Sequence, residues 1–431
     1  VIEKAMYNRL CDFFEKHNIF SPKQYGFRRG RSTITAIHQF THQILEGWEK
    51  KEKGVGVFMD LSKAFDCVNH KILIHKLERY GIRGNALQWL QSYLSLRKQF
   101  VEIQGQRSGS GLVKRGVPQG SVLGPLLFII YINDLPDWVE NDICIFADDS
   151  NLLVKDKNYE ELEKKLYIDL QCMEQWFDEN QIPINDDKTV NMPFSIKATE
   201  EEGPRVEIGD REIQSVNEIP FLGVIIDDGL RWTGHIDTLC TKLKSAVFLL
   251  RRLAKVCDKH TMRSVYASLF ESAMRYGIVF WGGSSAENVE RVLLIQKDAV
   301  RCLTGREKWE KVGDHYQPPS CKPLFKEANL LTVPSCYIFE AIQYFLTNGD
   351  GLRVGEASAY RTRNASDFRL PKIRLEKSKQ DVLYAGASFY NKLPAEIKLI
   401  TGTREFKSKL KGWLIDKVIY SLAEWNSGLG T

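Results

Sequence analysis

The sequence has no apolar run long enough to cross a membrane, because its longest, Leu126–Ile132, falls far short of the ~20 residues that a spanning helix needs. Its nine cysteines include no Cys-x-x-Cys pair and no Cys/His set at zinc-ligand spacing. The first absence argues against a membrane protein, and the second argues against a disulfide scaffold or a zinc finger. With no signal peptide in view, we expect reduced thiols in an intracellular protein.

Both halves of the chain carry many positive and many negative residues, but the balance between the two signs changes along the sequence. Residues 1–230 carry 28 Lys and Arg against 35 Asp and Glu, a net charge of −7. Residues 231–431 carry 32 against 20, a net charge of +12. This division suits an enzyme that holds metal ions in one part and a polyanion in another. Charge drift without functional meaning is the alternative.

Internal repeats and low-complexity tracts are also missing, and 431 residues are enough for two or three domains. Since Val1 lies inside an expected helix, we expect a fragment that lacks upstream sequence. We place the main boundary near 227–229 and a loop-rich stretch at 345–380. The apolar pattern predicts helices in 1–50, a strand at 55–59, helices near 63–80 and 84–96, a hairpin at 99–115 turning at 109–111, an apolar helix ending at 135, strands at 143–146 and 152–154, a helix near 158–180, strands at 182–184 and 221–226, and basic helices from 235 onward.

Three aspartates stand where strands end. Asp60 follows a buried strand, and Asp148 and Asp149 form a tight turn between two apolar runs. Extending a nucleic acid chain uses two divalent cations held by carboxylates on rigid backbone. An Asp-Asp pair is more often a turn or a cap than a metal site, and the pairs at 186–187 and 227–228 lack strand flanks on both sides. Only the 148–149 pair has them.

The wider pattern is more specific. The segments FMDLSKAFD at 58–66, GVPQGSVLGP at 116–125 and FADD at 146–149 resemble motifs A, B and C of reverse transcriptases, in that order. The segments QYGFRRGRST at 24–33 and LLFIIYINDLP at 126–136 resemble the non-LTR retrotransposon enzymes, most closely the jockey-like and CR1-like lineages. The resemblance continues at residues 221–224, 275–282 and 393–397, so it covers nearly the whole chain.

This resemblance implies an α+β right-hand polymerase fold. Its expected parts are partial fingers at 1–50, a palm with a small antiparallel sheet at 51–228, a helical thumb at 229–305 and a basic C-terminal region at 306–431. The reverse transcriptase domain would span about 1–228. The implied activity extends a DNA primer on an RNA template from deoxynucleoside triphosphates, with two Mg²⁺ ions or Mn²⁺ as cofactors. The implied location is the nucleus and cytoplasmic ribonucleoprotein, and the oligomeric state is left open.

The metal and sugar sites carry over by position. The resemblance implies that Asp60, Asp148 and Asp149 ligate the metals, with the backbone carbonyl of Leu61 as a further ligand. Phe65 would lie against the sugar of the incoming nucleotide and exclude a 2′-hydroxyl. Outside the motif, an aromatic residue at this position would be interpreted as part of the core.

The nucleotide pocket and a proton donor carry over in the same way. Gln119 and Gly120 would line the pocket, where a glycine lets backbone approach the substrate closely. Lys188 matches motif D and would protonate or neutralise the leaving pyrophosphate. A solvated surface lysine is the alternative for Lys188.

Basic residues in two regions are candidates for nucleic-acid contacts. Arg28 and Arg31 would face template or phosphate. Lys242, Arg251 and Arg252 lie on an expected thumb helix whose apolar face is separate, and they would grip the template–primer duplex. Simple surface exposure is the alternative for each. A second basic stretch could bind element RNA or target DNA: Arg361, Arg363, Arg369, Lys372, Arg374, Lys377 and Lys379.

Two other functions stay open at this point. A catalytically inactive, nucleic-acid-binding remnant would bind hybrid duplex without extending it, and Asp60→Ala would leave that binding unchanged. An RNA-templated RNA polymerase is disfavoured by Phe65. No Ser/His/Asp or Cys/His nucleophile set stands out, and the pair His38 and His42 lacks a third ligand.

Overall fold

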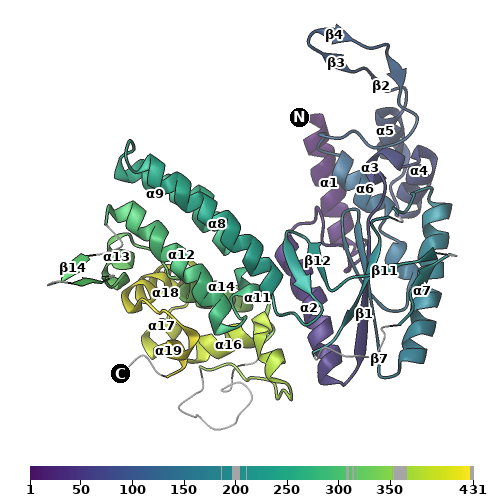
Figure 1. The fold of residues 1–431 in the computed structure, drawn as a ribbon. Coiled ribbons are helices and arrows are strands. Elements are labelled where there is room, and N and C mark those ends of the chain that lie inside the picture. The colour runs from purple at the N-terminus through teal and green to yellow at the C-terminus, as the bar shows by residue number, and fades with distance from the viewer. Residues whose placement is uncertain are drawn as a thin grey trace. The chain divides into compact units, whose positions relative to one another are not determined.

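The computed structural model describes residues 1–185, 187–196, 204–209, 211–306, 310–312, 315–317, 319–351, 353 and 366–427. The chain forms two compact units, Val1–Asn217 and Glu218–Thr431 (Figure 1). The division falls shortly before the boundary expected near Asp227. The finer division into fingers, palm, thumb and C-terminal region stays a prediction.

The first unit is built on a five-stranded sheet whose central strand, β1, is buried along six of its seven residues. Side chains alternate between the two faces of this strand. Val55, Val57 and Met59 belong to the main core, whereas Phe58 packs against Phe40 on the other face. The order is β11-β8-β1-β7-β6, antiparallel except for the β11–β8 pair. The strands are β1 Lys53–Met59, β6 Asp142–Phe146, β7 Asp149–Asp156, β8 Val190–Phe194 and β11 Gln214–Ser215, with a separate pair β9 Glu207–Ile208 and β10 Arg211–Glu212.

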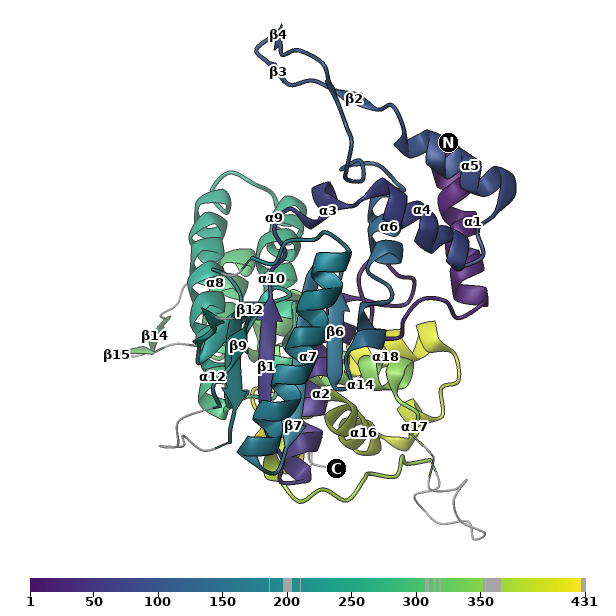
Figure 2. The ribbon, with the colours of Figure 1, turned by 90° about the vertical axis from the view of Figure 1, so that its right-hand side faces the viewer.

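Helices cover both faces of this sheet (Figures 1 and 2). Helix α2 packs on the face that carries Phe58, and its N-cap residue Ser32 forms a capping box with Thr35. The apolar helix α6 lies in the main core on the other face, with all but one of its residues buried. The helices are α1 Ile2–Lys16, α2 Thr33–Glu49, α3 Ala64–Cys67, α4 His70–Arg79, α5 Gly84–Leu94, α6 Gly124–Tyr131, the 3₁₀ turn Leu135–Trp138 and α7 Tyr159–Glu179.

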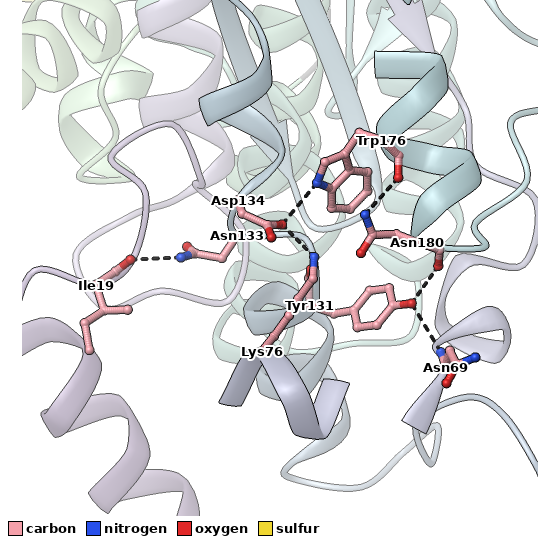
Figure 3. Close-up of polar contacts among 8 residues, drawn as sticks. All are labelled: Ile19, Asn69, Lys76, Tyr131, Asn133, Asp134, Trp176 and Asn180. Atoms are coloured by element: carbon pink, nitrogen blue, oxygen red, sulfur yellow. Dashed lines mark hydrogen bonds and ion pairs between the residues drawn. The ribbon is translucent and has the colours of Figure 1, made fainter. Parts of the chain in front are cut away.

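A polar network inside the main core joins α4, α6 and α7 (Figure 3). The Lys76 ammonium donates to the Tyr131 carbonyl at 2.8 Å and to the Asp134 carboxylate at 2.6 Å. The Trp176 indole donates to the same carboxylate at 3.2 Å, and the Tyr131 hydroxyl donates to the Asn180 carbonyl at 2.6 Å. Hydrogen bonding of this kind is what lets charged and polar groups lie among buried helices.

Several local expectations were wrong, among them the single strand at 221–226, where residues 218–221 and 224–227 instead form a hairpin that turns at Leu222-Gly223. The helix expected at 63–80 is interrupted, because Val68 is extended and the Asn69 side chain caps α4 by accepting from two backbone N–H groups. The hairpin at 99–115 turns at Gln104-Gly105, both with positive φ, and not at 109–111. The stretch 182–184 makes one isolated bridge, while the strand β8, which contains a proline, was not anticipated.

The second unit opens with a hairpin and continues as helices. Helix α8 packs against α12, and α14 packs against α16. Near the end of α14, Arg353 forms a bridge to Phe368, whose backbone is held on both sides by the Asn391 side chain. The elements are β12 Glu218–Phe221, β13 Val224–Asp227, α8 Thr233–Leu253, α9 Lys259–Val265, the π-helix Tyr266–Glu271, α10 Ser272–Arg275, α11 Ile278–Trp281, α12 Ala286–Thr304, β14 Glu310–Val312, β15 His315–Gln317, α13 Lys322–Glu327, α14 Val333–Asn348, the 3₁₀ turn Glu376–Gln380, α16 Val382–Asn391, α17 Ala395–Lys398, α18 Thr403–Lys417 and α19 Leu422–Asn426.

The mixture of helices with a small, mainly antiparallel sheet confirms the α+β class. Within the described part of the chain, no helix combines the length and apolarity that crossing a bilayer requires.

Candidate active site

Three carboxylates come together at one end of the five-stranded sheet. Asp60 directly follows β1, and Asp148 and Asp149 lie where β6 turns into β7. Strands β1 and β7 are antiparallel and pair Met59 with Ser150. Each step along one strand matches a step back along the other, so Asp60 lies level with Asp149. Carboxylates almost ninety residues apart in sequence therefore share one edge of the sheet.

The electrostatics of the three carboxylates reflect this crowding. Partial burial and the nearby charge of Asp60 raise the pKa of Asp148. Removal from water, followed by the charges of Asp148 and Asp60, raises the pKa of Asp149 to about 6, although this residue keeps an exposed side. Like charges that share a site disfavour ionisation of one another, and a cation between them relieves that repulsion. The cluster is thus an oxygen-rich site suited to a hard divalent cation.

A short segment near the N-terminus braces the turn that carries Asp148 and Asp149. The backbone N–H of Tyr25 donates to the Ile145 carbonyl at 2.8 Å, and the N–H of Ile145 donates to the Lys23 carbonyl at 3.0 Å. The buried Gln24 side chain accepts from the N–H of Ala147 at 3.2 Å. Ala147 has φ of 57°, a left-handed conformation that non-glycine residues seldom adopt.

Gly26 also belongs to this brace, at a position where no larger residue would fit. The Gln24 side-chain oxygen also accepts from the Gly26 N–H at 2.7 Å. A Cβ at position 26 would lie 2.4 Å from the Ala147 nitrogen, so the close approach requires glycine. The sequence marked this segment by resemblance, but it gave no sign that Gln24 holds the turn, since the two positions are 123 residues apart.

Asp60 is held from a second side by the segment that follows α7. The Asn185 N–H donates to the Asp60 carbonyl at 2.8 Å, and its side-chain amide donates to the Asp60 carboxylate at 3.2 Å. The Lys188 ammonium lies 3.3 Å from the same carboxylate and stays largely exposed. Leu61 lies opposite Ile184 in an isolated antiparallel bridge, whose hydrogen bonds are made by the backbone groups on either side of these two residues. The structure thus brings Lys188 and Leu61 to the carboxylates, whereas the part played by Asn185 was not foreseen.

Of the predicted pocket residues, Phe65 lies on α3, just beyond Asp60, and Gln119 contacts this helix from the loop before α6. The Gln119 side chain donates to the Asp66 carboxylate at 2.9 Å, and the N–H of Val117 donates to the Phe65 carbonyl at 2.9 Å. The Phe65 ring stacks on Phe128, with 4.3 Å between ring centroids, so its plane is fixed. Gly120 has φ of 78° and open space around its Cα. The fixed ring of Phe65 thus lies on the helix that begins four residues after Asp60, and the side chain of Gln119 is bonded to the same helix.

The two candidate arginines near the N-terminus differ in their surroundings. Arg28 is 10% exposed, and its guanidinium donates to both Glu15 carboxylate oxygens and to the Ser21 carbonyl. Arg31 is exposed and lies over the ring of Tyr25, 4.9 Å from its centroid. Arg28 is thus committed to internal contacts, which leaves Arg31 as the more accessible cation.

The candidate cations of the second unit lie along α8. Lys242 is exposed, Arg251 lies 3.6 Å from the Asp298 carboxylate, and Arg252 lies over the Phe248 ring. The opposite face of this helix is buried through Leu239, Leu243, Val247 and Leu250, as expected.

The second basic stretch is only partly available for an external ligand. Arg361 and Arg363 lie outside the described residues. The Lys377 ammonium donates to the Leu230 carbonyl at 2.7 Å, and burial lowers its pKa to about 8. Lys379 pairs with Glu376 at 2.5 Å. Lys377 therefore anchors its own segment to the loop before α8.

Comparison with known proteins decides the family. Residues 1–226, more than half of the chain, match the model of the family described as reverse transcriptase (RNA-dependent DNA polymerase). The chain belongs to the reverse transcriptase family. The match begins before the brace at Gln24 and ends at β13, so it includes all three carboxylates.

Relatives of this reverse transcriptase chain come from mobile elements. It is 30% identical over 319 residues to the probable RNA-directed DNA polymerase from transposon BS of Drosophila melanogaster, covering 70% of this chain and 34% of the relative. It is 26% identical over 325 residues to the RNA-directed DNA polymerase from mobile element jockey of the same species, covering 73% and 35%. The chain thus spans about a third of the length of these relatives. They confirm the resemblance to jockey-like, non-LTR retrotransposon reverse transcriptases.

Among solved structures, a telomerase from Candida tropicalis in complex with a fragment of telomeric RNA matches 96% of this chain and 56% of its own, at 12% identity and a TM-score of 0.42.

Reverse transcriptases work with divalent metal ions and act on a template and a primer. The crowded carboxylates at Asp60, Asp148 and Asp149 fit such ions in charge and in donor chemistry.

Proposed function

We propose that this chain extends a DNA primer on an RNA template, with Asp60, Asp148 and Asp149 holding two divalent cations. The observation that carries the proposal is the convergence of three mutually repelling carboxylates from β1 and the β6–β7 turn. Mg²⁺ is the expected ion because it favours carboxylate oxygens and retained waters, and Mn²⁺ is the alternative. When bound, such a pair of ions activates the primer 3′-hydroxyl and stabilises the charge of the leaving pyrophosphate.

The chain's own part in this reaction is to fix the carboxylates in place. The Asn185 amide fixes the Asp60 carboxylate, and Gln24 fixes the backbone that aims Asp148 and Asp149. The Leu61 carbonyl adds a further oxygen donor at the same edge. Positions held by rigid strands and hydrogen bonds need no rearrangement when the substrate arrives, which favours catalysis.

Selection of the sugar falls to Phe65 and the loop that contacts it. Its ring is held between Phe128, stacked at 4.3 Å, and Phe27, edge-on at 6.5 Å. A ring that cannot turn aside excludes a 2′-hydroxyl by contact. Gln119, held by Asp66, and Gly120, with no side chain, leave room for the incoming nucleotide beside it.

Lys188 is the proposed proton donor for the leaving group. Its ammonium lies 3.3 Å from the Asp60 carboxylate and is 70% exposed, so it can turn toward a phosphate. Proton transfer or simple charge neutralisation would both assist departure of pyrophosphate.

Template and primer phosphates would be held by exposed cations. Arg31 in the first unit and Lys242, Arg251 and Arg252 in the second offer charge-assisted contacts to a polyanion. We infer that an RNA of the mobile element is copied from a primer on target DNA. The corresponding location is the nucleus and a cytoplasmic ribonucleoprotein.

The test is primer extension on an RNA template by purified chain. We expect Asp60→Ala and Asp148→Ala each to lower the extension rate about 10³-fold or more, because several kcal/mol of charge stabilisation disappears. Asp187→Ala is the matched control, since that side chain is 95% exposed and belongs to the other Asp-Asp pair at 186–187. It should leave the rate within about twofold.

Two outcomes would contradict the proposal. Extension that survives Asp60→Ala would remove the site assignment. Tight, salt-sensitive binding of hybrid duplex without extension by the unaltered chain would favour the inactive remnant instead.

A further inference from the structure

A two-stranded ribbon projects from the first unit between α5 and the loop at Gly116. We call residues 95–115 the ribbon arm. Its strands are β2 Lys98–Gln99 with β5 Gly111–Leu112, and β3 Glu102–Ile103 with β4 Gln106–Arg107. Every residue from 95 to 112 is exposed, and the tip at β3 and β4 stands away from the rest of the unit (Figures 1 and 2).

The composition of the ribbon arm is unusual for a solvated surface loop. Five apolar side chains are at least half exposed: Leu96 84%, Phe100 50%, Val101 62%, Ile103 68% and Leu112 50%. Apolar groups displayed together on a projecting element indicate a binding surface. A two-stranded ribbon alone in water is only marginally stable, so a partner that covers this one would also stabilise it.

The charge of the ribbon arm indicates which kind of partner. The arm carries one acidic residue, Glu102, against five basic residues: Arg97, Lys98, Arg107, Lys114 and Arg115. The guanidinium of Arg107 pairs with Glu102 and also lies over the Phe100 ring, at 4.9 Å from its centroid. A basic surface interleaved with exposed apolar and aromatic groups is complementary to nucleic acid, whose phosphates and base faces need both.

The root of the ribbon arm is hydrogen-bonded to the segment that follows Asp60. Directly after Arg115, the Gly116 N–H donates to the Val68 carbonyl at 2.8 Å, and the next N–H donates to Phe65. Phe65 lies on α3, which begins four residues after Asp60. The arm's six residues from Lys98 to Ile103 can extend ~20 Å at the usual rise of a strand. The arm can therefore reach nucleic acid that lies that far from a root bonded to the segment after Asp60.

We propose that the ribbon arm binds the duplex of template and primer. Its basic residues contact phosphates, and its apolar tip lies in a groove, where a two-stranded ribbon fits. The wide, shallow minor groove of an A-form hybrid is accessible to such a tip. This inference rests on the proposed polymerase function, and it adds a contact that none of the reverse transcriptase motifs contains.

The first test removes four of the arm's five basic side chains from the full chain and keeps Arg107, which pairs with Glu102. The variant Arg97→Ser, Lys98→Ser, Lys114→Ser, Arg115→Ser is compared with Lys50→Ser, Lys51→Ser, Lys157→Ser, Lys164→Ser. The second set carries the same charge and is exposed near the opposite end of β1. Fluorescence anisotropy measures the Kd of a labelled RNA–DNA hybrid against salt concentration.

We expect the arm variant to weaken binding at least tenfold and to lower the slope of log Kd against log salt by about 2 to 4, since each lost phosphate contact removes about 0.9. The control should change the Kd by less than about twofold. An arm variant with the slope and Kd of the unaltered chain overturns the proposal. An equal loss on blunt double-stranded DNA assigns the arm to other DNA and overturns the choice of partner.

The second test addresses the apolar tip. Phe100→Ser with Ile103→Ser should weaken hybrid binding at high salt, where the charge contribution is small. If these changes abolish self-association in sedimentation and leave the hybrid Kd unchanged, the arm is a protein-docking surface and the proposal is wrong. Primer extension by the unaltered chain and its loss in Asp60→Ala test the polymerase function separately, so that failure of the arm proposal in the binding assay is distinguishable from failure of the polymerase function.

Discussion

At the scale of single residues, the candidate site depends on one uncommon backbone conformation and the side chain that holds it. Ala147 is left-handed, which costs an L-residue about 1–2 kcal/mol. Gln24 offsets that cost by accepting from the Ala147 and Gly26 N–H groups within the core. The position of Asp148 and Asp149 is therefore set by a residue that touches neither carboxylate.

Replacing Gln24 tests this role. We expect Gln24→Ala to lower the free energy of unfolding by about 2–4 kcal/mol, because two buried N–H groups lose their acceptor. The kcat for primer extension should change more than KM, because the substitution disturbs the positions of Asp148 and Asp149 and removes no contact with the substrate. Urea unfolding and steady-state kinetics measure both. Gln175→Ala, at an exposed position, should change stability by less than about 0.5 kcal/mol.

Replacing Phe65 tests sugar selection. We expect Phe65→Val to raise the efficiency of ribonucleotide use, relative to deoxynucleotide use, by about 10- to 100-fold. The reason is that Phe128 stays where it stacked on the lost ring, so no neighbouring side chain takes over the exclusion of the 2′-hydroxyl. The ratio of kcat/KM for matched nucleotide pairs provides the measurement. Free incorporation of ribonucleotides by the unaltered chain would show that the ring does not exclude them.

At this scale the sequence predicted which side chains carry the chemistry better than it predicted which side chains hold them in place. Asp60 and the pair at 148–149 could be recognised because each follows an apolar strand. Gln24 and Asn185 could not, because their roles consist of hydrogen bonds to residues more than a hundred positions away. Arg28 resembles a surface cation in sequence, yet Glu15 and the Ser21 carbonyl enclose it.

At the scale of elements, the main core is held in register by a few buried polar groups. Lys76 on α4 reaches Asp134 after α6, and Trp176 on α7 donates to the same carboxylate. Burial lowers the pKa of Lys76, and the charge of Asp134 opposes that effect. The pair thus fixes the relative positions of three helices whose buried faces are otherwise mainly apolar.

Removing the carboxylate from this network should be costly. We expect Asp134→Ala to lower the free energy of unfolding by roughly 2–4 kcal/mol, because a buried ammonium and an indole N–H lose their acceptor. Asp137→Ala, an exposed change three residues away, should cost less than about 0.5 kcal/mol. Chemical denaturation monitored by Trp fluorescence compares them, and equal values would contradict the role of the network.

A buried histidine should make the second unit sensitive to acid. His235 on α8 is 8% exposed, its Nδ1 accepts from the Ile225 N–H, and burial lowers its pKa to about 4, from 6.5. The unfolded chain therefore takes up the proton more readily between these values, so stability falls as pH falls through that window. From pH 7 to pH 5 we expect a loss of about 2 kcal/mol.

Thermal unfolding at the two pH values measures this loss. His235→Gln should remove most of the pH dependence, whereas His260→Gln, at an exposed position, should retain it. A pH response that is the same in all three proteins would assign the acid sensitivity elsewhere.

Element prediction succeeded where periodicity was long and failed where local chemistry decided. The helix at 159–179 and the strand before the 148–149 turn were expected almost to the residue, whereas the strand after the turn, β7, is longer than the expected 152–154. The break at Asn69 depends on a side-chain cap, and the turn at Gln104-Gly105 competes with a later glycine-rich stretch. Strand β8 was missed because it contains Pro193, and a proline in a sequence argues against a strand.

At the scale of the whole molecule, the chain consists of two units with different charge. The carboxylate site and every hydrogen-bonded neighbour in the five-stranded sheet lie within Val1–Asn217. The sequence anticipated an acidic part followed by a basic one, and it placed the boundary slightly late because β12 and β13 were counted with the sheet. They instead form a separate hairpin within the second unit.

We expect residues 1–217 to fold without the remainder of the chain. A piece that ends at residue 196 should be less stable, because it lacks β11, the parallel partner of β8. Circular dichroism and thermal melting of the two pieces provide the comparison. Absence of a cooperative transition in the longer piece would show that the first unit needs the second.

The contacts around Phe368 have a consequence for the integrity of the second unit. Arg353 and Asn391 hold the Phe368 backbone from opposite directions along the chain, and α14 packs on α16 across the same interval. Covalent continuity between residues 353 and 366 is therefore not what keeps these helices together. A protease cut in that interval should yield two fragments that co-migrate under native conditions and separate only in denaturant.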